Sequence, residues 1–289
     1  MGSRIEKQAN GSRPEYPGDG AEDGEDAMDN LQIDGILEKL RSHDAHTILE
    51  ALIELNRSIP EFNSDTRKEL ASAVSSLFYI DTVDMPEFTT VVGMAVKVVA
   101  GMGPELIPYH LQEMQGTDFK ALLCYARVLV ALGTDSISPI LEACEGSEED
   151  HLLVGAIYAL SKIRDESVLK GFPLIVGLCE NPAKEVRDTA VRALGKLVQY
   201  LPPSCFSPDQ RNKAFEALMG ATQDSSPGIR AKGVRGLGKM RGQGLLGPET
   251  REKALERIRQ VLGKHETYSW DTAYIVRREA EEALEHFAD

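Results

Sequence analysis

The segment NPAKEVRDTAVRALGKL, Asn181 to Leu197, has a near copy from Asp224 to Met240, which ends in SPGIRAKGVRGLGKM. In the first copy the apolar residues fall on one side of a helix; they are Val186, Ala190, Ala193, Leu194 and Leu197. Asn181 and Pro182 are residue types that commonly begin helices. The segment therefore predicts an amphipathic helix with one buried face, used at least twice in this chain.

These two copies and a third, later one align at an arginine. The pairs Val186-Arg187, Ile229-Arg230 and Val276-Arg277 lie 43 and 47 residues apart. In every copy a capping residue stands six positions before the arginine, a small residue three after it, and a leucine seven after it. These residues are, in that order, Asn181, Ala190 and Leu194; Asp224, Gly233 and Leu237; and Asp271, Ala280 and Leu284. The coincidence indicates an internal repeat.

Weaker copies continue upstream at spacings of about 30 to 34 residues. They begin near Ser147, Ala121 and Val92 and keep the apolar positions. Leu153 and Leu122 stand where the later copies have the arginine. A helical unit of this length cannot bury its apolar face alone, so the pattern predicts stacked helical hairpins that share one core.

The cap residue, the Val/Ile-Arg pair, the small residue and the Ala-Leu-Gly or Gly-Leu-Gly triplet resemble the HEAT repeat. The shorter upstream copies resemble the HEAT-like repeats of phycobilisome lyases. The resemblance implies an all-α solenoid, a HEAT/armadillo-like superhelix of about seven antiparallel hairpins over residues 31–289. It also implies a ladder of polar contacts between neighbouring repeats, with a weaker link at Asn181 because it is not an aspartate. The ladder residues would be Asn181, Arg187, Asp224, Arg230, Asp271 and Arg277.

Apolar spacing and start signals predict about fourteen helices after Leu31. The expected spans are 31–42, 45–58, 64–80, 86–102, 104–115, 117–132, 136–145, 148–163, 166–179, 183–201, 208–222, 226–241, 248–262 and 272–287. Start signals include a capping box of Ser147 with Asp150, the pair Ser207-Pro208, and Asp224 and Asp271. The stretch 91–100 is rich in valine, but its helical spacing predicts a helix.

Residues 1–30 carry no periodic apolar pattern, and the segment GDGAEDGEDAMDN from Gly18 is rich in glycine and acids. Over residues 1–34 there are nine acidic and three basic residues. Such a segment buries too little apolar surface to offset the entropy cost of ordering. It therefore predicts a disordered, acidic N-terminal tail.

The chain of 289 residues has a formal charge of -14, which disfavours nucleic-acid binding because that normally requires a basic surface. The cysteines have no metal-site spacing and predict reduced core residues; they are Cys124, Cys144, Cys179 and Cys205. No catalytic set stands out, and we predict no cofactor and no metal. We see neither a signal segment nor an apolar run of the ~18 residues that a membrane helix needs, so we expect a cytoplasmic protein.

One row of polar positions is predominantly basic. A rotation of about 100° per residue puts Arg192 and Lys196 opposite the buried face of their helix, and Arg235 and Lys239 hold these places in the next copy. Between residues 182 and 241 there are eleven basic and five acidic residues. Stacked helices bring equivalent positions together. The predicted partner-binding set, which we call the basic row, is Arg127, Tyr158, Lys162, Arg192, Lys196, Arg235 and Lys239.

These features predict a non-enzymatic, protein-binding scaffold or adaptor whose concave face binds an acidic helix or tail of a partner through the basic row. The chain's own acidic tail is a candidate competitor for that face. The alternatives are a lyase-like or chaperone-like role on a chromoprotein, a nucleic-acid-binding role, and a basic row that is only a solvated helix face. Trp270, beside Asp271, is expected to cap the end of the array or to anchor a partner.

Overall fold

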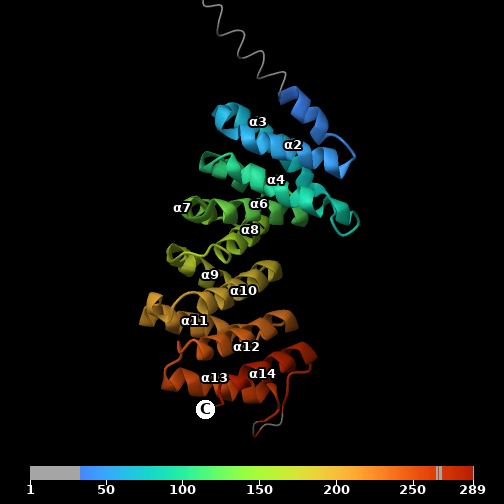
Figure 1. Ribbon diagram of the computed structural model, residues 1–289. Coiled ribbons are helices and arrows are strands. Elements are labelled where there is room, and N and C mark those ends of the chain that lie inside the picture. The colour runs from blue at the N-terminus through green and yellow to red at the C-terminus, as the bar shows by residue number, and fades with distance from the viewer. Residues whose placement is uncertain (1–32, 265, 267–268, 289) are drawn as a thin grey trace, which may run out of the picture.

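The computed structural model describes residues 33–264, 266 and 269–288, so the predicted acidic tail lies outside the described residues. The described chain is a two-layered stack of helices (Figure 1). One layer contains α2 (Ala45–Ser58), α4 (Thr89–Gly101), α6 (Phe119–Leu132), α8 (Asp150–Leu160), α10 (Lys184–Tyr200), α12 (Pro227–Gly242) and α14 (Tyr274–Glu285). The other contains α3 (Ser64–Ser75), α5 (Ile107–Glu113), α7 (Ile137–Cys144), α9 (Phe172–Leu178), α11 (Pro208–Ala221) and α13 (Pro248–Val261).

Shorter elements complete the stack. Residues 33–40 form a helix ahead of α2. Turns of 3-10 helix lie at Ile59–Glu61, Ser76–Tyr79, Pro86–Phe88, Pro104–Leu106, Gly133–Ser136, Glu166–Gly171 and Pro203–Cys205. Several of these turns replace the ends of longer helices that the sequence pattern predicts, such as 64–80 and 166–179.

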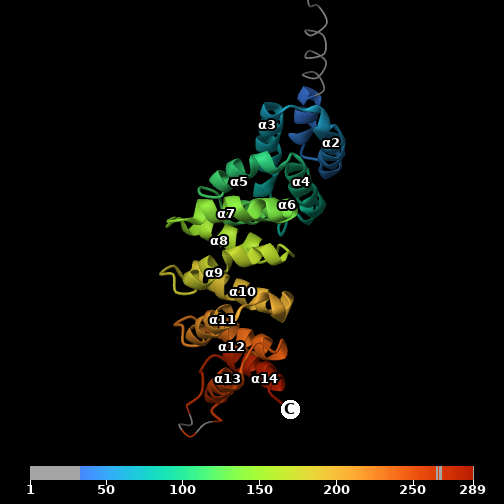
Figure 2. The ribbon, with the colours of Figure 1, turned by 90° about the vertical axis from the view of Figure 1, so that its left-hand side faces the viewer.

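Each even-numbered helix packs against the next, from α2 to α14, and pairs with the odd-numbered helix that precedes it in the chain. Figure 2 shows the two layers side by side. Helix 33–40 forms a first hairpin with α2. Lys39 Nζ of this helix lies 2.8 Å from Glu54 Oε2 of α2, in an ion pair. The described residues thus form seven hairpins, and the predicted all-α HEAT/armadillo-like solenoid is confirmed.

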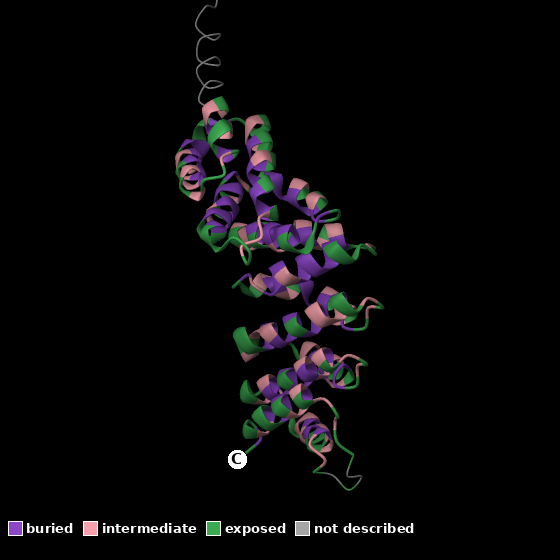
Figure 3. Ribbon diagram, turned by 90° about the vertical axis from the view of Figure 1, so that its right-hand side faces the viewer, coloured by how far each residue is buried: buried purple, intermediate pink, exposed green. Residues whose placement is uncertain are grey.

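The apolar core runs between the layers along the length of the stack (Figure 3). In α10 the predicted apolar face is the buried one, and Val186, Ala190 and Leu194 are fully inaccessible. Burying a valine or leucine side chain contributes ~1.5–3 kcal/mol relative to leaving it exposed. Each helix obtains this burial from its neighbours in both layers, which is why the unit recurs.

Three predicted helix starts lie before the observed ones. The helices α10, α12 and α14 each begin three residues after the expected cap residues Asn181, Asp224 and Asp271. In each case the cap side chain accepts a hydrogen bond from the backbone N–H two residues later, at 2.8, 2.7 and 2.9 Å. These residues therefore close a turn ahead of the helix.

The predicted capping box of Ser147 with Asp150 is wrong. Helix α8 begins at Asp150, and Ser147 Oγ accepts a 3.2 Å hydrogen bond from the N–H of Glu149, within the preceding turn. The predicted start at Ser207 is confirmed. Ser207 Oγ accepts from the N–H of Gln210 at 3.2 Å, and Gln210 Oε1 accepts from the N–H of Ser207 at 2.9 Å. This reciprocal capping box begins α11.

The helical run Phe119–Cys144, which joins α6 and α7, is long and apolar enough to cross a membrane by length and composition. The expectation that the chain has no such run is therefore wrong. The run turns at Gly133, whose φ is +66°, and half of its most apolar window is buried. Because α6 packs between α4 and α8, its apolar residues belong to the shared core.

Three cysteines lie in the core as predicted, and the fourth does not. Cys124, Cys144 and Cys179 are buried, whereas Cys205 is partly exposed. Burial raises the pKa of the Cys144 thiol to about 11 and that of Cys179 to about 12. A thiol with so high a pKa is a poor nucleophile at neutral pH, so these residues act as small apolar side chains.

Candidate functional site

The polar contacts of the repeat arginines join consecutive hairpins. Arg187 Nε donates to Asp224 Oδ2 at 2.8 Å, which connects α10 to the turn before α12. The same guanidinium donates from Nη1 to the carbonyl oxygens of Asn181 and Pro182, both at 2.9 Å. Arg187 therefore secures its own turn and the next one.

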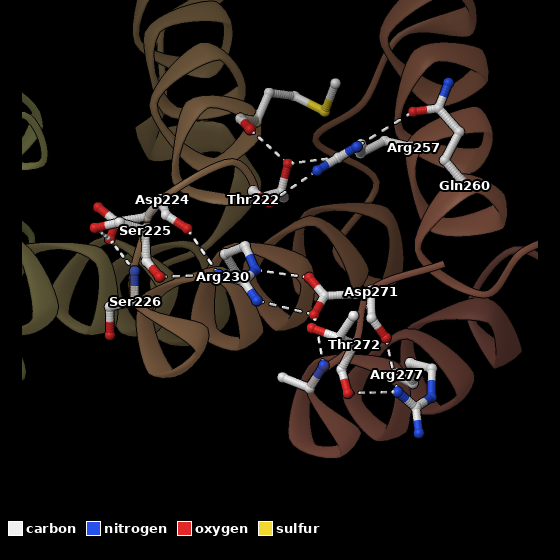
Figure 4. A network of polar contacts seen from close by, with 12 residues as sticks. Thr222, Asp224, Ser225, Ser226, Arg230, Arg257, Gln260, Asp271, Thr272 and Arg277 are labelled. Atoms are coloured by element: carbon white, nitrogen blue, oxygen red, sulfur yellow. Dashed lines mark hydrogen bonds and ion pairs between the residues drawn. The ribbon is translucent and has the colours of Figure 1, made fainter. Parts of the chain in front are cut away.

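Arg230 repeats this arrangement one hairpin later (Figure 4). Its Nε and Nη2 atoms donate to the two carboxylate oxygens of Asp271 at 2.6 and 2.9 Å. Its Nη1 atom donates to the carbonyl oxygens of Asp224 and Ser225 at 2.9 and 3.1 Å. Arg277 makes the corresponding contacts to the carbonyls of Asp271 and Thr272, at 2.7 and 3.0 Å.

The arginines keep the carboxylates of the ladder ionised. Burial, the largest single influence, acts to raise the pKa of Asp224 and Asp271. The hydrogen bonds and charges of Arg187 and Arg230, together with backbone N–H donors, outweigh it and hold both pKa values below the ordinary range. Asn181 has no equivalent donor one repeat upstream, because Leu153 stands at the arginine position. The ladder residues thus have structural partners within the chain.

The basic row is partly assembled by the fold. The Nζ atoms of Lys162 and Lys196 lie 5.7 and 5.8 Å from the centre of the Tyr158 ring. An ammonium group within about 6 Å of an aromatic ring is attracted to its face. Helix α8 with its following turn and helix α10 therefore bring three predicted residues to one place.

Lys196 lies at the centre of this group. Its half-buried ammonium has a pKa lowered to about 8, first by burial. Three neighbouring cations lower it further, and these are Lys162, Arg192 and Lys239. The pKa of Lys239 is also lowered, chiefly by burial and then by the charge of Arg235, while the charge of Glu279 acts in the opposite direction. We call Lys162, Arg192, Lys196 and Lys239 the Lys196 cluster.

A groove between α10 and α12 lies beside this cluster. It encloses about 340 Å³ and is lined by Val191, Arg192, Gly195, Lys196, Lys232, Arg235, Gly236 and Lys239. A Cβ atom on Gly195 would lie 3.9 Å from the Cα of Gly236, so the two helices approach closely at these glycines. Gly195 leaves this part of the groove without a side chain, whereas Gly236 makes room for Leu218 of α11, and the five bases give the groove a positive charge.

Acidic side chains of the same chain neutralise part of this charge. Lys232 forms an ion pair with Asp188, and Arg192 lies 3.8 Å from the same carboxylate. Arg235 Nε donates to Glu279 Oε2 at 2.6 Å, and Glu279 is only 1% exposed. Arg235 is therefore committed to a buried carboxylate of α14, which the prediction of a free partner-binding arginine did not foresee.

The remaining lysines of the row form no ion pair within the described part of the chain, although the charge of Glu279 acts on Lys239. The ion pairs of this face engage Arg192, Lys232 and Arg235, and none engages Lys162, Lys196 or Lys239. Charged groups that are half-buried without a partner are costly. Lys162 and Lys196 therefore carry charges that no ion pair among the described residues offsets.

Arg127 and Trp270 stand apart from this site. Arg127 is exposed on α6, and its charge acts on Cys124 of the same helix. Trp270 is 62% exposed, so it is not buried as a cap, and its ring lies 4.6 Å from the guanidinium carbon of Arg277. The equivalent positions on α14 hold Glu282 and His286 instead of bases. These two residues line a separate pocket of about 420 Å³ together with Arg235 and Lys239.

Sequence reasoning missed Lys232, Gly195 with Gly236, and Glu279 as parts of this surface. Lys232 and Glu279 carried no repeat signal of their own. The glycines were visible in the Ala-Leu-Gly and Gly-Leu-Gly triplets, where small residues at helix-contact positions indicate close approach. Lys232 and Arg235 pair with acidic side chains more than 40 residues away in the sequence. A pattern within one helix contains no information about such distant contacts.

A family model of the HEAT repeat matches residues 172–201, the region of α9 and α10. The resemblance to this repeat is thereby confirmed for the hairpin that contains the opening segment. No curated protein matches the chain significantly.

Two solved structures share much of this fold. The chain is similar to the complex of CpcE and CpcF of phycocyanin lyase from Nostoc sp. PCC7120, with a TM-score of 0.51, 20% identity, and coverage of 63% of this chain and 99% of that one. It is also similar to importin beta crystallised in ammonium sulfate, with a TM-score of 0.51, 17% identity, and coverage of 92% of this chain and 32% of that one. At such identities the similarity shows the solenoid fold and no shared activity.

Proposed function

We propose that the protein is a non-enzymatic scaffold or adaptor that binds an acidic segment of a partner protein. The binding face is the exposed side of α8, α10 and α12, where Lys162, Lys196 and Lys239 form no ion pair among the described residues. This group of lysines without ion pairs, within a chain of net charge -14, is the observation that carries the proposal. A stacked solenoid suits the task because it offers an extended, preformed surface.

The electrostatics of this face favour an acidic ligand. Lys196 has lost part of its hydration and faces other cations, so an incoming carboxylate supplies a favourable charge interaction in place of the water that burial removed. The ring of Tyr158 adds an aromatic surface beside the lysines. Complementary charge also speeds the encounter of the two proteins, and it does so most at low salt.

The test uses a helical peptide of sixteen residues with glutamates at every fourth position, and its glutamine counterpart. We expect the acidic peptide to bind the full chain in a fluorescence anisotropy titration, and the glutamine peptide to bind at least about tenfold more weakly. Lys196→Glu/Lys239→Glu should remove the preference. These lysines are better targets than Arg235, because Arg235→Glu would remove the arginine that pairs with the buried carboxylate of Glu279 and would destabilise the protein.

The matched control is Lys170→Glu/Lys213→Glu, which makes the same change in net charge at two exposed lysines outside the basic row. It should bind the acidic peptide as the wild type does, provided that circular dichroism shows equal helix content. Equal loss of binding in both double variants would mean that net charge alone, and not this face, is responsible. Binding of both peptides by all variants would refute the proposed site.

Two other roles are tested with the same material. A lyase-like or chaperone-like role on a chromoprotein, suggested by the shared fold with the CpcE and CpcF complex, predicts a copurifying pigment that absorbs visible light. A nucleic-acid role predicts salt-sensitive binding of an oligonucleotide to the same lysines. Either result would replace the scaffold proposal.

A further inference from the structure

The cations of the Lys196 cluster gather around Lys196, whereas a helix with spaced carboxylates presents its charges along a line. Lys162 lies with Lys196 at the Tyr158 ring, and Arg192 and Lys239 line the same groove as Lys196. Lys162, Arg192 and Lys239 all lie close enough to Lys196 to lower its pKa. The partial neutralisation of Arg192 by Asp188 is weak, because their closest atoms are 3.8 Å apart and the Arg192 side chain is 58% exposed. The ligand that fits best is therefore one small group with more than one negative charge.

A phosphoryl group has this chemistry. It carries about -1.5 to -2 charges at neutral pH and three strong acceptor oxygens, so one group can accept from several lysines and an arginine together. A single carboxylate carries one charge and two oxygens, which leaves part of the cluster uncompensated. Gly195 leaves space at the floor of the groove, since no side chain projects from it toward Gly236.

A largely apolar pocket, whose lining also includes Asp165 and Glu166, adjoins the cluster. It encloses about 240 Å³ at the end of α10 and shares Lys196 with the basic groove. Its apolar walls are Ile163, Leu197, Tyr200, Leu201 and Pro202, and the guanidinium of Arg164 lies 3.6 Å from the Tyr200 ring centre. A free anion would leave this pocket empty, whereas a peptide places its phosphorylated residue and a nearby apolar side chain in the two sites.

We propose that the Lys196 cluster binds a phosphorylated serine or threonine of the partner protein, and that the pocket beside Tyr200 receives an apolar side chain of the same segment. This inference rests on the proposed protein-binding function and specifies its ligand. It makes phosphorylation of the partner the switch that controls binding, because the unmodified residue offers the cluster no charge.

The first experiment measures binding of the full chain to three pools of nine-residue peptides with degenerate flanking positions. The central residue is phosphoserine in one pool, glutamate in the second and serine in the third. We expect the phosphoserine pool to bind at least about tenfold more tightly than the glutamate pool, and the serine pool more weakly still. Sequencing the retained phosphopeptides should show an enriched apolar residue at one fixed distance from the phosphoserine.

Variants locate the site. Lys162→Gln/Lys196→Gln should abolish the preference for phosphoserine, and the matched Lys170→Gln/Lys213→Gln variant should retain it. Tyr200→Ala should keep the phosphoserine preference and lose the enrichment of apolar residues. If Lys162→Gln/Lys196→Gln binds the phosphoserine pool as the wild type does, the phosphoryl site is elsewhere and the inference is overturned.

The remaining outcomes separate this inference from the proposed function. Equal binding of the phosphoserine and glutamate pools overturns the phosphoryl site and leaves the acidic-partner function standing. Binding of neither pool, together with failure of the acidic helix, rejects both. Inorganic phosphate that competes as strongly, mole for mole, as the phosphopeptide pool would show a site for a small free anion, which also overturns the inference.

Discussion

The N-terminal and C-terminal repeats share one fold and are joined by different chemistry. From α10 to α14, arginine–aspartate pairs connect each hairpin to the next. Upstream, Leu122 and Leu153 occupy the arginine position and are 0% and 1% exposed. Ion pairs also link N-terminal hairpins, such as that of Arg67 with Glu105 at 3.1 Å. At the position of the repeat arginine, however, apolar packing takes the place of the ion pair, whereas the bidentate pair adds a directional contact that constrains how one hairpin sits on the next.

Buried polar groups also differ between the two regions. The C-terminal carboxylates Asp224, Asp271 and Glu279 accept hydrogen bonds from arginines. In the N-terminal half, His110 on α5 is fully buried and neither ring nitrogen has a hydrogen-bond partner. Its ring lies among aromatic neighbours, 5.4 Å from that of Tyr109 and 6.1 Å from that of Tyr125. The two halves should therefore respond differently to acid.

The largest expected difference in stability between the N-terminal and C-terminal repeats develops as the pH falls from 6.5 to 4. Burial lowers the pKa of His110 to about 4, so over this range the unfolded chain takes up a proton that the folded chain does not. The N-terminal repeats should lose about 3 kcal/mol of stability. The Asp224 and Asp271 pairs, whose pKa values are lowered, keep their contribution throughout this range and lose it only at lower pH.

Hydrogen exchange with mass spectrometry at pH 7 and pH 4.5 measures this difference. We expect α2 to α8 to open before α10 to α14 at the lower pH. His110→Leu should remove the effect, because the buried group no longer titrates and its unsatisfied nitrogens are gone. Simultaneous opening of the whole stack in the wild type would contradict the comparison.

A smaller effect distinguishes two residues at equivalent positions of the ladder. Asp271→Ala should destabilise the protein by about 2 kcal/mol, since it leaves the partly buried Arg230 without its carboxylate. Asn181→Ala should cost about 1 kcal/mol or less, because it removes only the hydrogen bond to the N–H of Ala183. Urea unfolding of the two variants checks this order, and equal losses would show that the ion pair adds nothing to the stacking.

The smallest effect concerns the Lys196 cluster. A lysine whose pKa is lowered to about 8 in the folded state destabilises the protein at neutral pH, and stability should rise as pH rises from about 8 to 10.5. Lys196→Gln should remove that rise and raise stability near pH 7 by less than about 1 kcal/mol, since solvent screens a half-exposed group. Thermal unfolding from pH 7 to pH 10 tests this, with Lys213→Gln as the control that keeps the rise.

Much of the fold followed from periodicity. The i, i+4, i+7 spacing at Val186, Ala190 and Ala193 identified the buried face of α10, and recurrence of the pattern identified the stack. Helix starts were less predictable at Asn181, Asp224 and Asp271, because the same side-chain oxygen that caps a helix also closes a turn before one. The apolar run Phe119–Cys144 was likewise ambiguous, since a helix packed in the core and a membrane helix share a composition.

Periodicity and recurrence were enough to identify an array of helical hairpins, the residues of its shared core, and the arginines and aspartates that recur in register. Only the folded stack shows that Glu279 engages Arg235, that Asp188 engages Lys232, and that Lys162, Lys196 and Lys239 form no ion pair among the described residues. The reason is that the helical pattern and the side-chain contacts act over different distances along the sequence. A helical period fixes the direction of each side chain about its own axis, whereas the partner it meets depends on how hairpins distant in sequence stack against each other.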